Sequence, residues 1–232
     1  VMRTRPMQGR LEALCKLGAR ITCHGRAGHF PFTITTSGLP GGTWEVDASQ
    51  SSQILSALLM AAPLAQGQVD LKLAGETVSK PFVQMTLDMM HDFGARVSGE
   101  SLVKATISNT GSYRAKDIWS VEPDASAASY FLALPIVAGG EVELPGLTPK
   151  MLQGDMGFEA ILRQIGITTH FSESGLTSKA RPDSQCGGDF DFNAISDTFL
   201  TLAAIAPLLD SPTHISGIAH TRKQETDRIH AM

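Results

Sequence analysis

The stretch that decides the fold is residues 51–64, SSQILSALLMAAPL. Read as a helix, it is apolar on nearly every face, and serine at its start is a favoured N-cap. The same pattern returns at residues 124–137, DASAASYFLALPIV, and at residues 195–208, ISDTFLTLAAIAPL. We therefore expect three core helices, each buried on most faces and each opened by Ser or Asp.

A second pattern alternates with the first: an amphipathic run, then a glycine, then an extended segment. Its copies are LEALCKLGARI at 11–21, MTLDMMHDFGARV at 85–97 and FEAILRQIGIT at 158–168. Gly18, Gly94 and Gly166 are the expected helix C-caps, where a left-handed residue is needed. They stand 94 − 18 = 76 and 166 − 94 = 72 positions apart.

Segments that follow the apolar helices alternate polar and apolar residues, as in QVDLKL at 68–73 and GEVEL at 140–144. This alternation predicts strands. The repeating unit thus holds one amphipathic helix, one buried helix and several strands, and it is too long for the common solenoids of ~20–50 residues. We predict an α/β (α+β) layered fold with buried helices.

Composition narrows the class of protein. The chain has 232 residues, 42% hydrophobic and 18% charged, with a formal net charge of −4. These values indicate a packed globular protein, and they argue against a general nucleic-acid surface. No apolar stretch is long enough to span a membrane. Three cysteines without CxxC spacing favour a reducing, cytoplasmic location, and the scattered histidines show no metal-ligand spacing.

The repeat begins just before one amphipathic helix and stops within the first turns of another. We therefore expect an interior piece of a longer protein.

Charged residues gather where the helices begin. Arg5, Lys80 and Arg228 stand at entrances of amphipathic helices, although a cation there opposes the helix dipole. An anion between them would resolve the conflict, so these entrances predict a pocket for phosphate and carboxylate groups. The plainer interpretation is a set of caps and solvated turns. Walker A, GxGxxG and GxSxG motifs do not occur.

Six segments resemble the 5-enolpyruvylshikimate-3-phosphate synthase family, also called 3-phosphoshikimate 1-carboxyvinyltransferase. They are MRTRP at 2–6, SSQILSALLMAAPL at 51–64, VSKPF at 78–82, DASAASYFLA at 124–133, LQGD at 152–155 and ETDR at 225–228. The helix at 51–64 resembles the glyphosate-sensitive class. The resemblance implies an enolpyruvyl transferase fold of two lobes, each with βαβαββ units around buried parallel helices. Residues 1–120 would be two units of the first lobe, and residues 121–232 about one and a half units of the second, both partial.

The resemblance also implies a reaction: transfer of the enolpyruvyl group of phosphoenolpyruvate to the 5-hydroxyl of shikimate 3-phosphate, with release of phosphate. It implies no metal and no organic cofactor. The partners would be these two small molecules, with no nucleic acid and no membrane, and the intact enzyme would be a cytoplasmic monomer of the shikimate pathway. We expect the 232-residue chain alone to be inactive.

The family's site residues carry over position by position. Asp197 matches the carboxylate at the reacting hydroxyl, and Glu225 the carboxylate near the methylene carbon. The remaining matches bind substrate: Ser51, Ser52 and Ser79 hold shikimate 3-phosphate, Arg5, Gln53 and Arg228 surround phosphoenolpyruvate, and Gln224 stands at a phosphate-facing position. The resemblance implies that they converge in the intact, closed enzyme.

Three positions depart from the family pattern. Gln224 stands where Lys is frequent, Phe82 where Tyr is common, and His220 where Asn is common. Two other interpretations stay open. One is a sister enolpyruvyl transferase that acts on a UDP-sugar, although none of the three cysteines fits its attacking loop. The other is a non-catalytic domain built from the same repeats.

Overall fold

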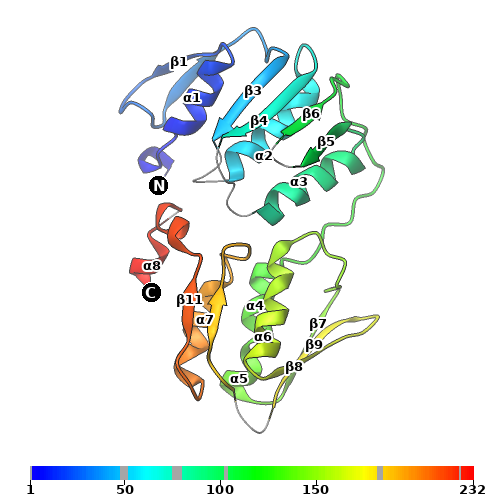
Figure 1. Ribbon diagram of the computed structural model, residues 1–232, viewed down its shortest axis with the longest axis vertical. Coiled ribbons are helices and arrows are strands. Elements are labelled where there is room, and N and C mark those ends of the chain that lie inside the picture. The colour runs from blue at the N-terminus through cyan, green and yellow to red at the C-terminus, as the bar shows by residue number, and fades with distance from the viewer. Residues whose placement is uncertain (1, 48–51, 75–79, 102–103, 182–184, 225) are drawn as a thin grey trace. The chain divides into compact units, whose positions relative to one another are not determined.

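A computed structural model describes the chain except for residues 1, 48–51, 75–79, 102–103, 182–184 and 225. It divides into two compact units, residues 1–117 and residues 118–232 (Figure 1). Each unit has its own hydrophobic core. The helices and strands therefore form two separate layered bodies, which are described in turn.

Unit 1 contains one complete βαβαββ repeat, preceded by a helix and a hairpin. Its sheet has the order β3-β4-β6-β5, in which β3 and β4 are parallel and the other neighbours antiparallel. Strands β1 and β2 form a separate antiparallel pair. In chain order the elements are the 3-10 helix η1 (Met2–Thr4), α1 (Gln8–Lys16), β1 (Arg20–Cys23), β2 (Phe32–Thr35), β3 (Gly42–Asp47), α2 (Ser52–Ala61), η2 (Ala62–Leu64), β4 (Val69–Ala74), α3 (Lys80–Asp92), β5 (Val97–Ser101) and β6 (Lys104–Ile107).

Helix α2 packs between its neighbours in unit 1. Gly9 of α1 approaches Ile54 so closely that a Cβ there would lie 3.5 Å from its Cδ1 atom. On the α3 side, the Thr86 hydroxyl donates to Ser56 Oγ at 2.9 Å. Figure 1 shows α2 and α3 against the four-stranded sheet. Helix α2 thus packs against α1, α3 and the sheet, and its apolar sequence suits these contacts.

Unit 2 repeats the same order without a first strand: residues 109–124, all described, contain none. The antiparallel sheet has the order β7-β9-β8, and β10 pairs in parallel with β11 across α7. Helices α4 and α6 lie side by side (Figure 1). The elements are α4 (Ala125–Leu132), α5 (Leu134–Ala138), β7 (Glu141–Pro145), η3 (Gly154–Gly157), α6 (Phe158–Gln164), β8 (Ile167–Phe171), β9 (Gly175–Ala180), β10 (Asp189–Asp191), α7 (Phe199–Ile205), η4 (Ala206–Leu208), β11 (His214–Ser216), η5 (Ala219–Lys223) and α8 (Arg228–Ala231).

Two buried hydroxyls join α4 to α7. Ser129 Oγ and Thr201 Oγ1 lie 2.7 Å apart, and the residues are 72 positions apart in the chain. Ser129 also donates to the backbone carbonyl of Ser126 at 2.6 Å. Each hydroxyl therefore has a partner in a region without water, where an unpaired hydroxyl is costly.

The glycine caps are confirmed. Gly18, Gly94 and Gly166 have φ values of 87°, 85° and 100°, each just after an amphipathic helix. Behind Gly18, the Ala19 N–H donates to the Leu14 carbonyl at 3.0 Å, so the helix end closes on itself. Strands β1, β5 and β8 follow these glycines, as the sequence predicted.

Each of the three apolar helices buries part of its surface and leaves another part exposed within its own unit. Leu59 of α2 and Leu202 of α7 are 2% and 0% exposed, whereas Met60 of α2 is 49% exposed and Tyr130 and Phe131 of α4 are 55% and 54% exposed. An all-apolar sequence permits burial on every face, but the neighbouring elements decide it. Within unit 2, α4 and α5 together leave one apolar stripe exposed: Tyr130, Phe131, Leu134 and Val137.

The predicted start of the third helix also needs correction. Asp124 caps α4 as expected, because its carboxylate accepts from the Ala127 N–H at 3.0 Å. Helix α7, however, begins at Phe199 after Thr198, which makes no side-chain cap bond. Ser196 and Asp197 therefore lie in the turn before the helix, and their side chains are used elsewhere. Along the described residues, no helix combines the length and the apolar character needed to cross a membrane.

Candidate functional site

The best-defined charged contact in unit 2 joins two predicted site residues. Arg228 Nη1 lies 2.5 Å from Asp197 Oδ1. The two side chains are 21% and 34% exposed, so the pair is partly shielded and still reachable from solvent. The contact is an ion pair with a charge-assisted hydrogen bond, and the solvent that reaches both side chains reduces its net contribution to stability.

Local structure holds both partners in place. Asp197 lies in a tight turn in which the Thr198 N–H and Oγ1 both donate to the Ile195 carbonyl, at 3.0 and 2.8 Å. Arg228 is the first residue of α8, whose N-cap Asp227 accepts from the His230 N–H at 3.0 Å. The turn before α7 and the start of α8 thus bring opposite charges together.

A histidine supports the same turn. His220 Nε2 lies 2.9 Å from Ser196 Oγ, next in sequence to Asp197. Burial lowers the pKa of His220, the charge of Asp197 raises it less, and Arg228 lowers it. His220 is therefore neutral at pH 7, so it contributes a hydrogen bond rather than a fixed positive charge.

Asp155 is a buried carboxyl within electrostatic reach of the same pair. It is 3% exposed, and its Oδ2 atom accepts a very short hydrogen bond from Ser126. Its Oδ1 atom is buried without a hydrogen-bond partner among the described residues. Burial raises the pKa of Asp155, against the opposing effect of the Ser126 hydrogen bond, and Asp197 raises it further.

The predicted residues of unit 1, described by themselves, include an amide and a cation. Gln53 Oε1 accepts from Arg10 Nη2 of α1 at 2.9 Å. Ser52, the first residue of α2, is buried, and half-buried Arg5 follows η1. Arg5 and Gln53 both take part in further interactions. The predicted residues of unit 1 thus lie where α1 and α2 begin.

Other predicted residues are less completely placed. Ser51, Ser79 and Glu225 lie outside the described residues. Gln224 follows η5 as its C-cap, and its Oε1 atom is buried with no hydrogen-bond partner in the described part of the chain. The convergence of the site residues in the intact, closed enzyme stays a prediction.

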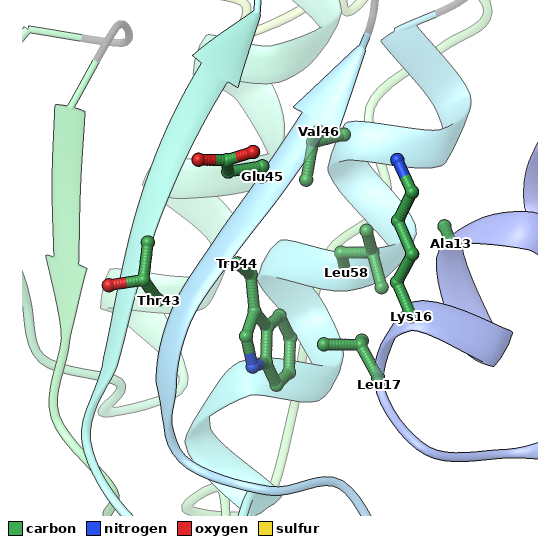
Figure 2. A pocket seen from close by; sticks show the side chains of 8 residues that line it. All are labelled: Ala13, Lys16, Leu17, Thr43, Trp44, Glu45, Val46 and Leu58. Carbon is green, nitrogen blue, oxygen red and sulfur yellow. The ribbon is translucent and has the colours of Figure 1, made fainter.

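A pocket in unit 1 lies apart from the predicted residues. It encloses about 190 Å³ and is lined by Ala13, Lys16, Leu17, Thr43, Trp44, Glu45, Val46 and Leu58. Figure 2 shows Leu17, Trp44 and Leu58 around its apolar part, with the Lys16 chain beside them. This pocket is lined by residues of α1, β3 and α2, and none of them is a predicted site residue.

Three contacts near the predicted residues were not predicted from the sequence, one in unit 1 and two in unit 2. Arg10 belongs to none of the motifs described above, and it contacts Gln53 across 43 positions of the chain. Asp155 was named only as part of the segment at 152–155. His220 was recognised only as a departure from the family. Each contact joins residues that are distant in sequence, and the periodicity of the sequence cannot predict such contacts.

The model of the family described as EPSP synthase (3-phosphoshikimate 1-carboxyvinyltransferase) matches residues 1–232. The chain belongs to this family. It is 47% identical to the 3-phosphoshikimate 1-carboxyvinyltransferase of Opitutus terrae, covering 100% of this chain and 51% of that protein. For the enzyme of the same name from Pseudoalteromonas translucida the values are 39%, 100% and 54%. The chain spans about half the length of these curated relatives.

Solved structures show the same fold. EPSP synthase from Acinetobacter baumannii superposes with a TM-score of 0.71 at 24% identity, over 99% of this chain and 52% of that one. The enolpyruvyl transferase NikO from Streptomyces tendae also gives 0.71, at 15% identity, over 90% and 50%. At these identities the likeness establishes the enolpyruvyl transferase fold and no more.

Proposed function

We propose that this chain carries part of the active site of a 3-phosphoshikimate 1-carboxyvinyltransferase. The reaction is transfer of the enolpyruvyl group of phosphoenolpyruvate to the 5-hydroxyl of shikimate 3-phosphate, with release of phosphate. Membership of the family supports the reaction class. The observation that carries the site assignment is the contact between the Asp197 carboxylate, in the turn before α7, and the Arg228 guanidinium, at the first position of α8.

The chemistry needs two proton transfers in opposite directions. The hydroxyl oxygen bonds to the central carbon of phosphoenolpyruvate and loses its proton, while the methylene carbon gains one. In the elimination the methyl group gives up a proton as phosphate leaves, which restores the double bond. Two separately placed carboxyl groups can serve these steps. We assign Asp197 to the hydroxyl and Glu225 to the methylene carbon.

The binding roles follow from charge. Arg5 and Arg228 can each present a planar fork of donors to carboxylate or phosphate oxygens. Gln53 is held by Arg10, which fixes the direction of its amide. Ser51, Ser52 and Ser79 are assigned to shikimate 3-phosphate, and Gln224 to a phosphate without adding charge. The proposal extends to small-molecule partners only and to a cytoplasmic, monomeric intact enzyme; the free state of Cys15, Cys23 and Cys186 suits a reducing compartment.

A chimera tests the proposal. The matching half of the Opitutus terrae relative, 47% identical, is replaced by residues 1–232 of this chain. We expect phosphate release from phosphoenolpyruvate plus shikimate 3-phosphate. Glu225→Gln in the chimera should lower turnover about 10²–10⁴-fold with little change in shikimate 3-phosphate binding. A folded chimera without turnover would contradict the function, and a fully active Glu225→Gln variant would remove Glu225 from the chemistry.

A further inference from the structure

The contact between Asp197 and Arg228 joins two groups that the proposed reaction uses separately. Arg228 Nη1 and Asp197 Oδ1 lie 2.5 Å apart, so each charge neutralises the other. An arginine in this state offers less attraction to an anion. The Oδ1 atom of Asp197 in this state accepts from the guanidinium and is not available to a substrate hydroxyl.

We infer that Arg228 exchanges partners, from Asp197 to the anionic substrate, and that this exchange releases the Asp197 carboxylate for catalysis. The inference rests on the proposed function. The substrate anion takes over the guanidinium. Asp197 then accepts the hydroxyl proton as the hydroxyl oxygen bonds to phosphoenolpyruvate, and the second carboxyl, Glu225, supplies the proton that the methylene carbon gains.

The surroundings of the pair suit an exchange rather than a permanent bridge. Arg228 and Asp197 keep 21% and 34% of their side-chain surface exposed, so an anion can approach from solvent. A partly exposed ion pair is weak in net free energy, because water and salt screen it. By contrast, the turn that carries Asp197 is held by bonds that the exchange leaves intact, from Thr198 to Ile195 and from His220 to Ser196.

Partner exchange has a consequence that a simple binding role lacks. Asp197 competes with the anion for Arg228, so removing its charge should strengthen anion binding. We expect Asp197→Asn to bind inorganic phosphate about two- to five-fold more tightly, the size expected from releasing one partly exposed ion pair. The same variant should lose turnover in the chimera, because the hydroxyl proton has no acceptor.

Asp227 supplies a matched control. It lies next to Arg228 in sequence but contacts Arg222 at 3.0 Å, and it caps α8. Asn is also a good N-cap, so Asp227→Asn removes one negative charge beside Arg228 while the helix start and the Asp197 contact remain. A general electrostatic gain would appear in both variants, whereas partner exchange predicts a gain in Asp197→Asn only.

The experiment measures inorganic phosphate binding to the 232-residue chain by calorimetry at constant ionic strength, with circular dichroism as a check on folding. Arg228→Gln should weaken binding, Asp197→Asn should strengthen it, and Asp227→Asn should leave it near wild type. Equal gains in Asp197→Asn and Asp227→Asn would overturn the exchange, while a loss in Arg228→Gln would still uphold the anion-binding role. Phosphate binding that survives Arg228→Gln would overturn both the exchange and that role.

Discussion

Helices α2 and α4 have the same kind of sequence but different surroundings. Aligned on Pro63 and Pro135, Leu59 of α2 matches Phe131 of α4, yet these residues are 2% and 54% exposed. In unit 1, α2 packs on α1 and on α3, and Tyr113 donates to the Met60 carbonyl at 2.7 Å. In unit 2, α4 packs beside α6 and α7 and leaves Phe131 open. The next aligned pair shows the reverse, because Met60 of α2 is 49% exposed and Leu132 of α4 is 3% exposed. An apolar sequence thus allows a helix to be buried on any face, and the elements that pack on it determine which residues are buried.

The largest effect should come from truncating the matched pair Leu59 and Phe131. Leu59→Ala leaves a cavity in the core of unit 1 and should cost about 2–5 kcal/mol. Phe131→Ala should cost no more than about 1 kcal/mol, because much of its ring is already in solvent. Two units need not unfold together, so hydrogen exchange should be read separately for each helix. Equal losses at the two positions would show that α4 is covered after all.

The second effect concerns the hydroxyl pair between α4 and α7. Ser129→Ala removes a partner from buried Thr201 and should cost about 1–3 kcal/mol. The double change with Thr201→Val should cost less than the sum of the single changes. The position that matches Ser129 in α2 is exposed Ala57, so Ala57→Ser should stay within about 0.5 kcal/mol. Additive costs in the double variant would mean that the two hydroxyls do not interact.

The pH dependence of local stability should also differ between α2 and α4. Burial raises the pKa of Asp155, which Ser126 of α4 contacts. A raised folded pKa gives a contribution that is present below the unfolded value and is lost as pH rises through the folded one. Wild type should therefore lose stability relative to Asp155→Asn as pH rises above about 4, the ordinary pKa of an aspartate, in exchange at α4 but not at α2. A pH-independent difference between the two proteins would contradict this assignment.

The smallest effect should come from the contact that closes the far end of α2. Tyr113→Phe removes the bond to the Met60 carbonyl and should cost about 0.5–1.5 kcal/mol, toward the lower value because the bond is exposed. Exchange should quicken at the end of α2 and remain unchanged in α4. Faster exchange throughout unit 1 would instead give Tyr113 a wider structural role.

Local features of the fold could be predicted from the sequence because they depend on near neighbours. The C-caps at Gly18, Gly94 and Gly166 need only a left-handed residue after a helix, and the cap at Asp124 needs only its own helix start. The exposure of Phe131 could not be predicted, because it depends on which elements pack beside α4.

The candidate site divides in the same way. The resemblance selected Asp197 and Arg228, but no rule of spacing predicts that they contact each other across 31 positions. The short bond from Ser126 to Asp155 and the contact of Arg10 with Gln53 likewise arise from folding. The predicted cap role of Ser196 was wrong because α7 begins at Phe199, so the N-cap position is occupied by Thr198 and Ser196 lies in the preceding turn.

The contact between Ser129 and Thr201 bears on how the copies of a repeated unit can diverge. Ser129 of α4 and Thr201 of α7 occupy the same position in successive copies of the repeat. If the two copies were identical, the same residue type would therefore face itself across this contact. Few residue types suit that meeting: twin lysines or twin aspartates repel each other, and twin alanines leave a gap. A hydroxyl can donate to its twin and accept from it, which makes it self-complementary. Ser and Thr can therefore replace one another at this position in either copy while the hydrogen bond between the two helices is kept.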